Sequence, residues 1–503
     1  CSHSFFKTTH ASFINGSEVM SHLCHVIANH WVAGIGKEFL SVNPASGEKM
    51  WEGTAATKVE VEQAVQAARK ATVSWAAIKV HERMAYLETF RDKLSERKEH
   101  FVHVISQDTG KPLWESRTEV EAMVTKIALS IQAYEEFSLS SRNDSAQARA
   151  SVRRKPHGVV AVLGPFNLPG HLPNAHMVPA LIAGNTVVFK PSELTPAVGR
   201  ELAKLWLTAD LPAGVFNMVQ GGAETGRYLI EHLGINGVFF TGGYDAGRSI
   251  HLALAGSPEK IVALEMGGNN PLAIANVDDV DAAAYWTIQS AFITSGQRCT
   301  CARRLIVLEN EKSDRFLDCL IGMMKGIRIG PYTTDPEPFM GPVISTCAAD
   351  RLLGAQESLC KQGGVCLVEM NRMDGGAMLV PGLIDMTYAK QRSDDELFGP
   401  LLQVVRVQTF EQLIAEANET AYGLAAGIFS DEPAMYEKFY CGVRTGIVNW
   451  NYPLTGASGR MPFGGIGRSG NYRPSGYYAA QYCSYPIASL EQHRLAMPKN
   501  LTP

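Results

Sequence analysis

The sequence predicts an α/β protein built on a doubly wound parallel sheet. In the middle of the chain short apolar runs alternate with amphipathic segments of helix length, which is the pattern of repeated βα units. Glycine-rich turns follow several of these runs, as expected where a ligand approaches the end of a strand. At 503 residues the chain is too long for one ordinary core, so two or three domains are expected.

The composition excludes several classes of protein. Hydrophobic residues make up 46% and charged residues 19% of the chain, which is typical of a globular enzyme. A net charge of -4 gives no basic surface for nucleic acid, and no apolar run reaches the roughly 20 residues that span a bilayer. No secretory signal is predicted, and the ten cysteines show neither CxxC nor zinc spacing. The expectation is a cytoplasmic protein without a metal site, a nucleic-acid partner or a membrane partner.

The N-terminal part is expected to be mostly helical. Residues 1–24 are interpreted as an extension of uncertain order, because a regular pattern begins only after them. Short apolar runs broken by glycines over 25–51 predict a small β meander. Helical spacing and turn signals then predict three helices and a polar loop, over 59–75, 81–100, 113–137 and 138–148.

The middle of the chain supplies the parallel sheet. Buried strands are expected over 159–163, 186–189, 215–219, 237–240 and 261–264. The first is followed by a loop at 164–167 and a helix that ends near Gly184, and Thr195-Pro196 opens the next helix. Ligands of such a sheet bind at the carboxyl ends of its strands.

A second α/β series begins with a helix at 280–294 and a strand at 304–308 and continues to about residue 466. The segment 477–490 is expected to be an extended strand. It has no obvious partner in its own neighbourhood, so a contact between subunits is predicted for it.

Three residues have side chains suited to covalent catalysis, although each also has a simpler interpretation. Cys299 follows Gly-Gln after an apolar segment, and it is either a buried spectator or a nucleophile. Glu265 ends an apolar strand, as an exposed terminus or as a desolvated base. Asn167 is either a turn residue or an amide donor to an oxyanion.

A nucleotide site is suggested by two strand ends. Gly242-Gly243-Tyr244-Asp245-Ala246-Gly247 lies between a strand and a helix, where glycines let a phosphate approach the helix N-terminus, although a structural turn explains it equally well. Lys190 and Glu193 follow another strand. They are either solvated surface charges or ribose contacts in the same crevice.

Together these segments resemble the NAD(P)-dependent aldehyde dehydrogenase superfamily over residues 25–495. The segments that carry the resemblance, in chain order, are Pro165–Pro169, Glu265–Gly268, Gly296–Cys299, Glu396–Pro400 and Pro462–Gly465. Further stretches, including Phe166–Asn174 and Gln297–Arg304, resemble members that act in arginine catabolism on a semialdehyde with two carboxylates.

The resemblance implies a role for each residue. Cys299 would be the nucleophile, Asn167 the oxyanion donor and Glu265 the base that activates water. Lys190 and Glu193 would contact the adenosine ribose of NAD, the Gly242–Gly247 loop its pyrophosphate, and Glu396 and Phe398 its nicotinamide ribose. Gly243 stands where many members have serine, so weaker NAD binding is expected. Cys301 and Arg304 would be structural.

The substrate and the domain organisation complete the expectation. Two carboxylates on the substrate require cations, and Arg298 and Arg460 are the candidates.

The resemblance implies an NAD-binding domain (25–140 and 157–264), a catalytic domain (265–470) and an oligomerisation element (141–156 and 471–495) in a homodimer or higher homo-oligomer. The alternatives are a dehydrogenase of another aldehyde, an acylating dehydrogenase that uses coenzyme A, and a catalytically silent binding protein.

Overall fold

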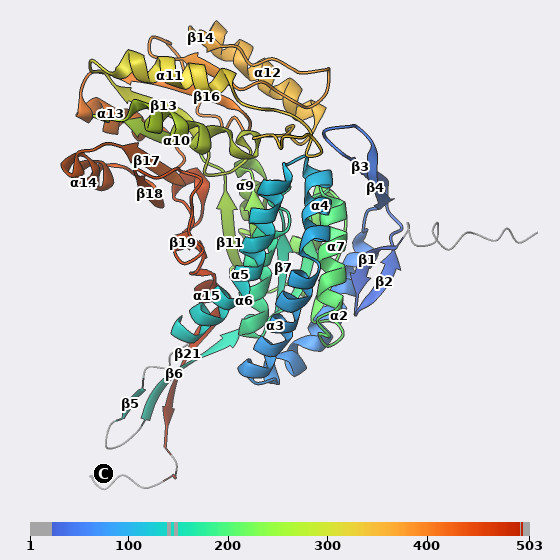
Figure 1. The fold of residues 1–503 in the computed structure, drawn as a ribbon. Helices are drawn as coiled ribbons and strands as arrows, with labels where there is room; N and C mark the ends of the chain where they lie inside the picture. The colour runs from blue at the N-terminus through green and yellow to red at the C-terminus, as the bar shows by residue number, and fades with distance from the viewer. Residues whose placement is uncertain (1–22, 138–141, 145–148, 493, 496–503) are drawn as a thin grey trace, which may run out of the picture.

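The computed structural model describes residues 23–137, 142–144, 149–492 and 494–495. Figure 1 shows two halves, each with helices packed around a β-sheet, and a narrow arm that leaves the first half. Leu23 and Cys24 already belong to the first strand, so the extension expected over 1–24 ends earlier than predicted, and its other residues lie outside the described part.

The first half contains a seven-stranded sheet in the order β11-β10-β7-β8-β9-β1-β2. Its strands are β1 (Leu23–Ile27), β2 (His30–Ala33), β7 (Val159–Leu163), β8 (Thr186–Lys190), β9 (Phe216–Met218), β10 (Gly237–Gly242) and β11 (Ile261–Met266). The strands β7 to β11 are parallel, as predicted, while β1 is antiparallel to β9. The predicted meander is wrong in one respect. Its first hairpin joins this sheet, and only β3 (Glu38–Val42) and β4 (Lys49–Thr54) form a separate hairpin.

Helices cover both faces of this sheet, so its strands are buried on both sides. Val160 and Val162 of β7 face one core, and Val159 and Ala161 face the other. The surrounding helices are α2 (Lys58–Ala77), α3 (Val80–Glu96), α4 (Lys98–Thr109), α5 (Leu113–Phe137), α6 (His171–Ala183), α7 (Pro196–Leu207), α8 (Ala223–Glu231) and α9 (Tyr244–Leu254). The helix predicted over 81–100 is interrupted at Arg97, where α3 ends and α4 begins.

The second half contains the other seven-stranded sheet, in the order β14-β15-β16-β13-β12-β17-β18. Its strands are β12 (Asn270–Ile274), β13 (Ala302–Leu308), β14 (Val365–Val368), β15 (Gly382–Asp385), β16 (Leu401–Val407), β17 (Ala425–Phe429) and β18 (Ile447–Trp450). Its helices are α10 (Val280–Phe292), α11 (Ser313–Lys325), α12 (Thr346–Lys361), α13 (Phe410–Ala417) and α14 (Pro433–Gly442), and the 3-10 turn η1 (Ile293–Gly296) follows α10. The central strand β12 was not predicted.

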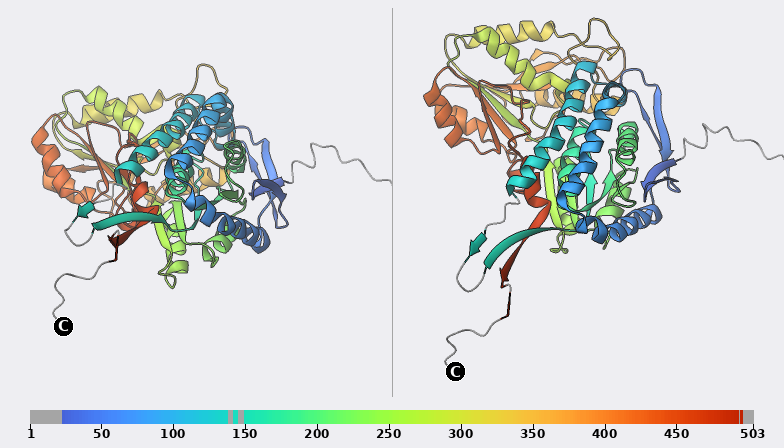
Figure 2. Two further views of the ribbon diagram at one scale, coloured as in Figure 1. Left: turned by 90° about the horizontal axis from the view of Figure 1, so that it is seen from below. Right: turned by 60° about the horizontal axis from the view of Figure 1, so that its bottom comes forward.

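The arm is a three-stranded sheet of β5 (Arg142–Asp144), β6 (Arg149–Pro156) and β21 (Ser484–Glu491), and Figure 2 shows it projecting from the body in two further views. Two sequence predictions are corrected here. The described part of the loop predicted over 138–148 is β5, and the rest lies outside the described residues. The segment 477–490 starts with the short helix α15 (Ala479–Tyr482), and its strand β21 pairs with β6 of the same chain.

Short elements join the arm to the second half, namely β19 (Pro462–Phe463), the 3-10 turn η2 (Gly467–Ser469) and β20 (Ser475–Gly476). No helix in the described ranges is long and apolar enough to cross a membrane. The division into domains and the oligomerisation role of the arm stay predictions.

Candidate active site

Cys299 lies in a strained loop between α10 and β13. Thr294 and Ser295 have φ values of 58° and 53°, and Gly296 has a φ of 71°. A side chain at position 296 would overlap the carbonyl of Gly399, so only glycine fits there. Strain of this kind is maintained only where the surroundings determine the conformation. Here Asn270 contributes, because its Nδ2 donates to the carbonyl of Cys299 at 2.6 Å.

The loop after β7 meets the Cys299 loop from the first half. The Nδ2 of Asn167 donates to the carbonyl of Gln297 at 2.8 Å. Behind Asn167, the Nζ of Lys111 donates to its carbonyl at 3.0 Å and forms a buried ion pair with Glu119. The Oε1 of Glu119 also accepts the N–H of Gly170 at 2.8 Å. Buried charges that are satisfied in this way hold the Asn167 loop against the loop of the thiol.

Glu265 comes to the same place from β11. It is buried, and its Oε1 accepts the backbone N–H of Ser475 at 3.0 Å, whereas Oε2 has no hydrogen-bond partner among the described residues. Burial raises the pKa of this carboxyl well above its usual value. Burial also raises the pKa of Cys299 to about 12, and the charges of Glu396 and Glu265 add to this shift. The two carboxylates therefore lie near the thiol.

Two strand ends of the first sheet form the predicted nucleotide crevice. Lys190, at the end of β8, is buried, and its Nζ donates to the carbonyls of Pro191 at 2.8 Å and Gly221 at 2.7 Å. The carboxylate of Glu193 lies 3.5 Å from this ammonium and remains 48% exposed, so it is free to meet a ribose.

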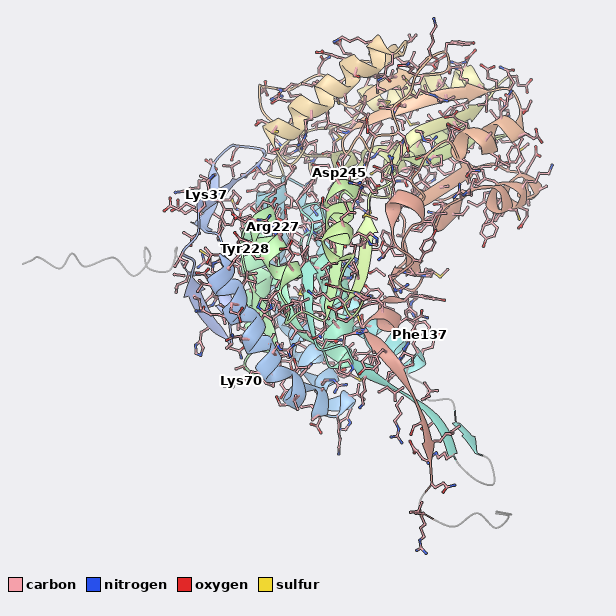
Figure 3. All side chains as sticks on the ribbon, turned by 180° about the vertical axis from the view of Figure 1, so that it is seen from behind. Lys37, Lys70, Phe137, Arg227, Tyr228 and Asp245 are labelled. Atoms are coloured by element: carbon pink, nitrogen blue, oxygen red, sulfur yellow. The ribbon has the colours of Figure 1, made fainter. Side chains whose placement is uncertain are left out.

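The predicted pyrophosphate loop lies at the end of β10. Gly242 ends the strand, Gly243 caps α9, and Tyr244, Asp245 and Ala246 form the first turn, while Gly247 packs on Met266 without room for a side chain. Figure 3 shows Asp245 at the end of α9 that approaches the second half. A Cβ at Gly243 would meet nothing within 4 Å, so open space lies above this helix N-terminus. An anionic pyrophosphate fits such a place.

Glu396 and Phe398 reach the site from the segment before β16. The Oε1 of Glu396 accepts the N–H of Gly268 at 3.1 Å. The Phe398 ring meets Phe166, beside Asn167, edge to face with 5.8 Å between ring centroids, and the Arg303 guanidinium lies 5.4 Å from the Phe398 ring centroid. The structure thus brings the predicted catalytic and nicotinamide-side residues together between the two sheets.

Comparisons of sequence and of structure with known proteins point to one enzyme family. The model of the aldehyde dehydrogenase family matches residues 31–486. The chain belongs to the aldehyde dehydrogenase family. Two curated relatives, from Chromobacterium violaceum and Pseudomonas fluorescens, are each 52% identical over 95% of this chain and 98% of their own length, and both are named N-succinylglutamate 5-semialdehyde dehydrogenase.

Solved structures share the fold of this aldehyde dehydrogenase along nearly its whole length. A methylmalonate-semialdehyde dehydrogenase from Oceanimonas doudoroffii is 25% identical with a TM-score of 0.90, over 95% of this chain and 99% of that one. An NADP-dependent glyceraldehyde-3-phosphate dehydrogenase from Bacillus halodurans, complexed with NADP, is 28% identical with a TM-score of 0.88, over 93% and 99%. The predicted fold class is confirmed.

The predicted substrate arginines are placed less favourably in this aldehyde dehydrogenase. The Arg298 guanidinium donates to Thr294 at 2.8 Å and to buried Glu115 at 3.0 Å, so a protein carboxylate already neutralises it. Arg460 is exposed, and its Nη1 donates to Gln132 at 3.3 Å. Arg304 is buried among backbone carbonyls, as expected of a structural residue. Within the described ranges, no group of three or more His, Cys, Asp or Glu side chains could hold a metal ion.

Sequence reasoning missed the polar residues of α5 that face the site. Glu115, Glu119, Lys126 and Ser130 are all buried on this helix. Their four- and seven-residue spacing is the signal that could have revealed them, because charged residues on the buried stripe of a helix need partners.

Proposed function

We propose that the protein oxidises N-succinyl-L-glutamate 5-semialdehyde to N-succinyl-L-glutamate with NAD and water, a step of arginine catabolism. The observation that carries the proposal is the 52% identity over nearly full length to two curated relatives named for this activity. The convergence of Cys299, Glu265 and Asn167 supports it, because this set provides the groups that thioester chemistry needs.

The nucleotide crevice fits NAD. The open N-terminus of α9 at Gly243 would hold the pyrophosphate, while Lys190 and Glu193 would contact the adenosine ribose and Glu396 and Phe398 the nicotinamide side. When bound, NAD supplies the acceptor for the hydride that leaves the substrate. The exposed carboxylate of Glu193 favours NAD over NADP, because it would repel a 2′-phosphate.

Groups of the protein carry out the attack on the aldehyde, hold the oxyanion and hydrolyse the thioester. The Cys299 sulfur, once its proton is removed, bonds to the aldehyde carbon, and Asn167 Nδ2 with the Cys299 N–H holds the oxyanion. After hydride transfer the substrate is a thioester on Cys299. Glu265 takes a proton from water, the water oxygen bonds to the thioester carbon, and the C–S bond breaks to release the acid and the thiol. Glu265 suits this role because its buried Oε2 has no hydrogen-bond partner within the described residues.

Gly243→Ser is expected to tighten NAD binding by up to about tenfold, since one hydrogen bond to a charged group is gained. Gly243 has φ -74° and ψ 156°, which serine adopts without strain, and its Cβ would point into open space. Fluorescence titration of NAD measures the change. Gly256→Ser, at another glycine whose Cβ would be unobstructed, is the control, and equal affinities of Gly243→Ser and the unsubstituted protein would contradict the expectation.

NADH formation from N-succinylglutamate 5-semialdehyde tests the proposed function. We expect its kcat/KM to exceed that of an unsubstituted aliphatic aldehyde by at least about 100-fold, since charged hydrogen bonds distinguish the two substrates. A higher value for another aldehyde, or a requirement for coenzyme A, would replace the proposal with one of the alternatives.

Arg460→Ala tests the predicted contact between Arg460 and a substrate carboxylate. That prediction is wrong if the variant has the same KM for the semialdehyde as the unsubstituted enzyme.

The three-stranded arm supports a proposed homodimer or higher homo-oligomer, because its exposed strands project from the body. Within this proposal, residues 141–156 and 471–495 form the oligomerisation element, and the protein acts in the cytoplasm. Light scattering after size exclusion, on the whole chain and on a variant that lacks 484–491, measures the assembly.

A further inference from the structure

Lys126 differs from the other buried lysines of the described residues, which are Lys111, Lys190 and Lys260. Its Nζ donates to the carbonyl of Gly476 at 2.6 Å, and in the described part of the chain no carboxylate pairs with it. Burial accordingly lowers the pKa of Lys126 to about 8.

The other three buried lysines each have an acidic neighbour, which Lys126 lacks among the described residues. Lys111 forms an ion pair with Glu119, Lys190 lies 3.5 Å from Glu193, and two nearby glutamates act on the charge of Lys260. An ammonium group removed from water is costly unless an anion compensates it. The surroundings of Lys126 are therefore suited to an anion that the protein itself does not provide.

Other buried polar groups of α5 and α6 also lack partners within the described ranges. Among the described residues, neither amide atom of fully buried Asn174 is hydrogen-bonded, and the same holds for the Nδ1 of His171 and the Oγ of Ser130. His171 and Asn174 are one turn apart on α6, and Lys126 and Ser130 are one turn apart on α5. The two helices pack along each other (Figure 1). Buried polar groups are normally paired, so these unpartnered groups on two packed helices are available to a polar ligand.

This cluster adjoins the catalytic thiol. The charges of Lys126 and Arg298 both act on His171, and Arg298 immediately precedes Cys299. On its other side, Lys126 binds the carbonyl of Gly476, the neighbour of Ser475, whose N–H donates to Glu265. His171 is thus within electrostatic reach of the residue before Cys299, and Lys126 binds the segment that holds Glu265, so the cluster is near both reacting groups.

We propose that Lys126, together with His171 and Asn174, binds a carboxylate of the substrate and makes the enzyme selective for anionic aldehydes. This assignment rests on the proposed function and names the cation that Arg298, already paired with Glu115, does not supply. An ammonium and an amide N–H donate to one carboxylate with charge-assisted hydrogen bonds, which are about twice as strong as neutral ones.

A purely positioning role for Lys126 makes a different prediction. Through Gly476 and Ser475, Lys126 holds the segment that orients Glu265. Loss of that support would slow the oxidation of every aldehyde, charged or not. Loss of a carboxylate contact would instead affect the charged substrate selectively.

The experiment measures kcat/KM for N-succinylglutamate 5-semialdehyde and for uncharged hexanal in the complete enzyme with NAD. In Lys126→Met the ratio of the two values is expected to fall about 10–100-fold, the effect of one hydrogen bond to a charged group, and Lys126→Arg is expected to recover part of it. Lys98→Met, at a partly exposed lysine that pairs with Glu121, is the matched control and should keep the ratio.

Equal losses for both aldehydes, or no loss, would overturn the proposal. If Lys126→Met fails to fold, calorimetric binding of N-succinylglutamate and of its uncharged triamide to the unsubstituted enzyme decides, and equal affinities count against the subsite. A wild-type enzyme inactive on the semialdehyde would overturn the proposed function alone. The same ratio would then be measured with succinate semialdehyde as the anionic aldehyde.

Discussion

Replacing Cys299 with alanine is expected to lower kcat by at least about 10⁴-fold, as loss of a nucleophile does in other covalent enzymes. The strained Cys299 loop, the amide of Asn167 and the buried carboxyl of Glu265 converge on one sulfur, so no other thiol can take its place. Steady-state NADH formation measures the loss, and mass spectrometry should detect no acylated protein.

The control for this substitution is Cys301→Ala. Cys301 is two residues away and fully buried, and its Sγ lies 3.8 Å from the carbonyl of Ile293, which fits a packing role. It should keep activity within a few-fold of the unsubstituted enzyme. Both variants should bind NAD as the parent does, because neither residue is in the nucleotide crevice. NADH production by Cys299→Ala at the parental rate would place the active site elsewhere.

The parallel sheets could be predicted because the signals of their strands and helices are local. The strand at 159–163 is an unbroken apolar run, and Gly184 ends the next helix with a φ of 97°, as expected of a C-terminal glycine. The carboxyl ends of parallel strands meet at one edge, so a ligand was expected there, while the roles of Asn167 and Glu265 were implied by the family resemblance.

Several features could not be predicted because they depend on distant contacts. No strand was predicted over 270–274, yet β12 forms there and accommodates Pro271 with a register shift against β13. Nothing at Arg97 signals a helix end. The ion pair of Arg298 with Glu115, which is distant in the sequence, was not predicted, and the substrate contact of Arg298 stays a prediction. Lys126 is one lysine in an amphipathic pattern until the fold shows that it is buried without an acid.

The pKa of Cys299, about 12, changes the interpretation of the nucleophile. With this pKa the Cys299 thiol is protonated at neutral pH, because burial and the charges of Glu396 and Glu265 disfavour the thiolate. Removal of the thiol proton must then accompany the reaction. Glu265, whose pKa is raised by burial and whose charge acts on Cys299, is the candidate base for this step.

Replacing Glu265 with glutamine is therefore expected to lower kcat by about 10²–10⁴-fold, the range for loss of a general base. Glutamine can still accept the Ser475 N–H, but it cannot take a proton from water. If Glu265 acts only on water, NADH should still appear in a rapid burst of one equivalent per active site, and mass spectrometry should detect the acyl group on Cys299. If Glu265 also removes the thiol proton, no rapid burst should appear. Glu259→Gln, on the surface, is the matched control.

The raised pKa of Glu265 also predicts two pH effects with definite signs. In the parent, kcat should fall as the pH decreases through this raised pKa, because the base becomes protonated, and the glutamine variant should lose that dependence. A carboxyl with a raised pKa in the folded state costs stability as the pH rises above its unfolded value, since folding then opposes ionisation. Glu265→Gln should accordingly raise Tm more at pH 8 than at pH 5. An equal Tm difference at both pH values would show that Glu265 ionises as freely in the fold as in the unfolded chain, and the argument for a desolvated base would fail.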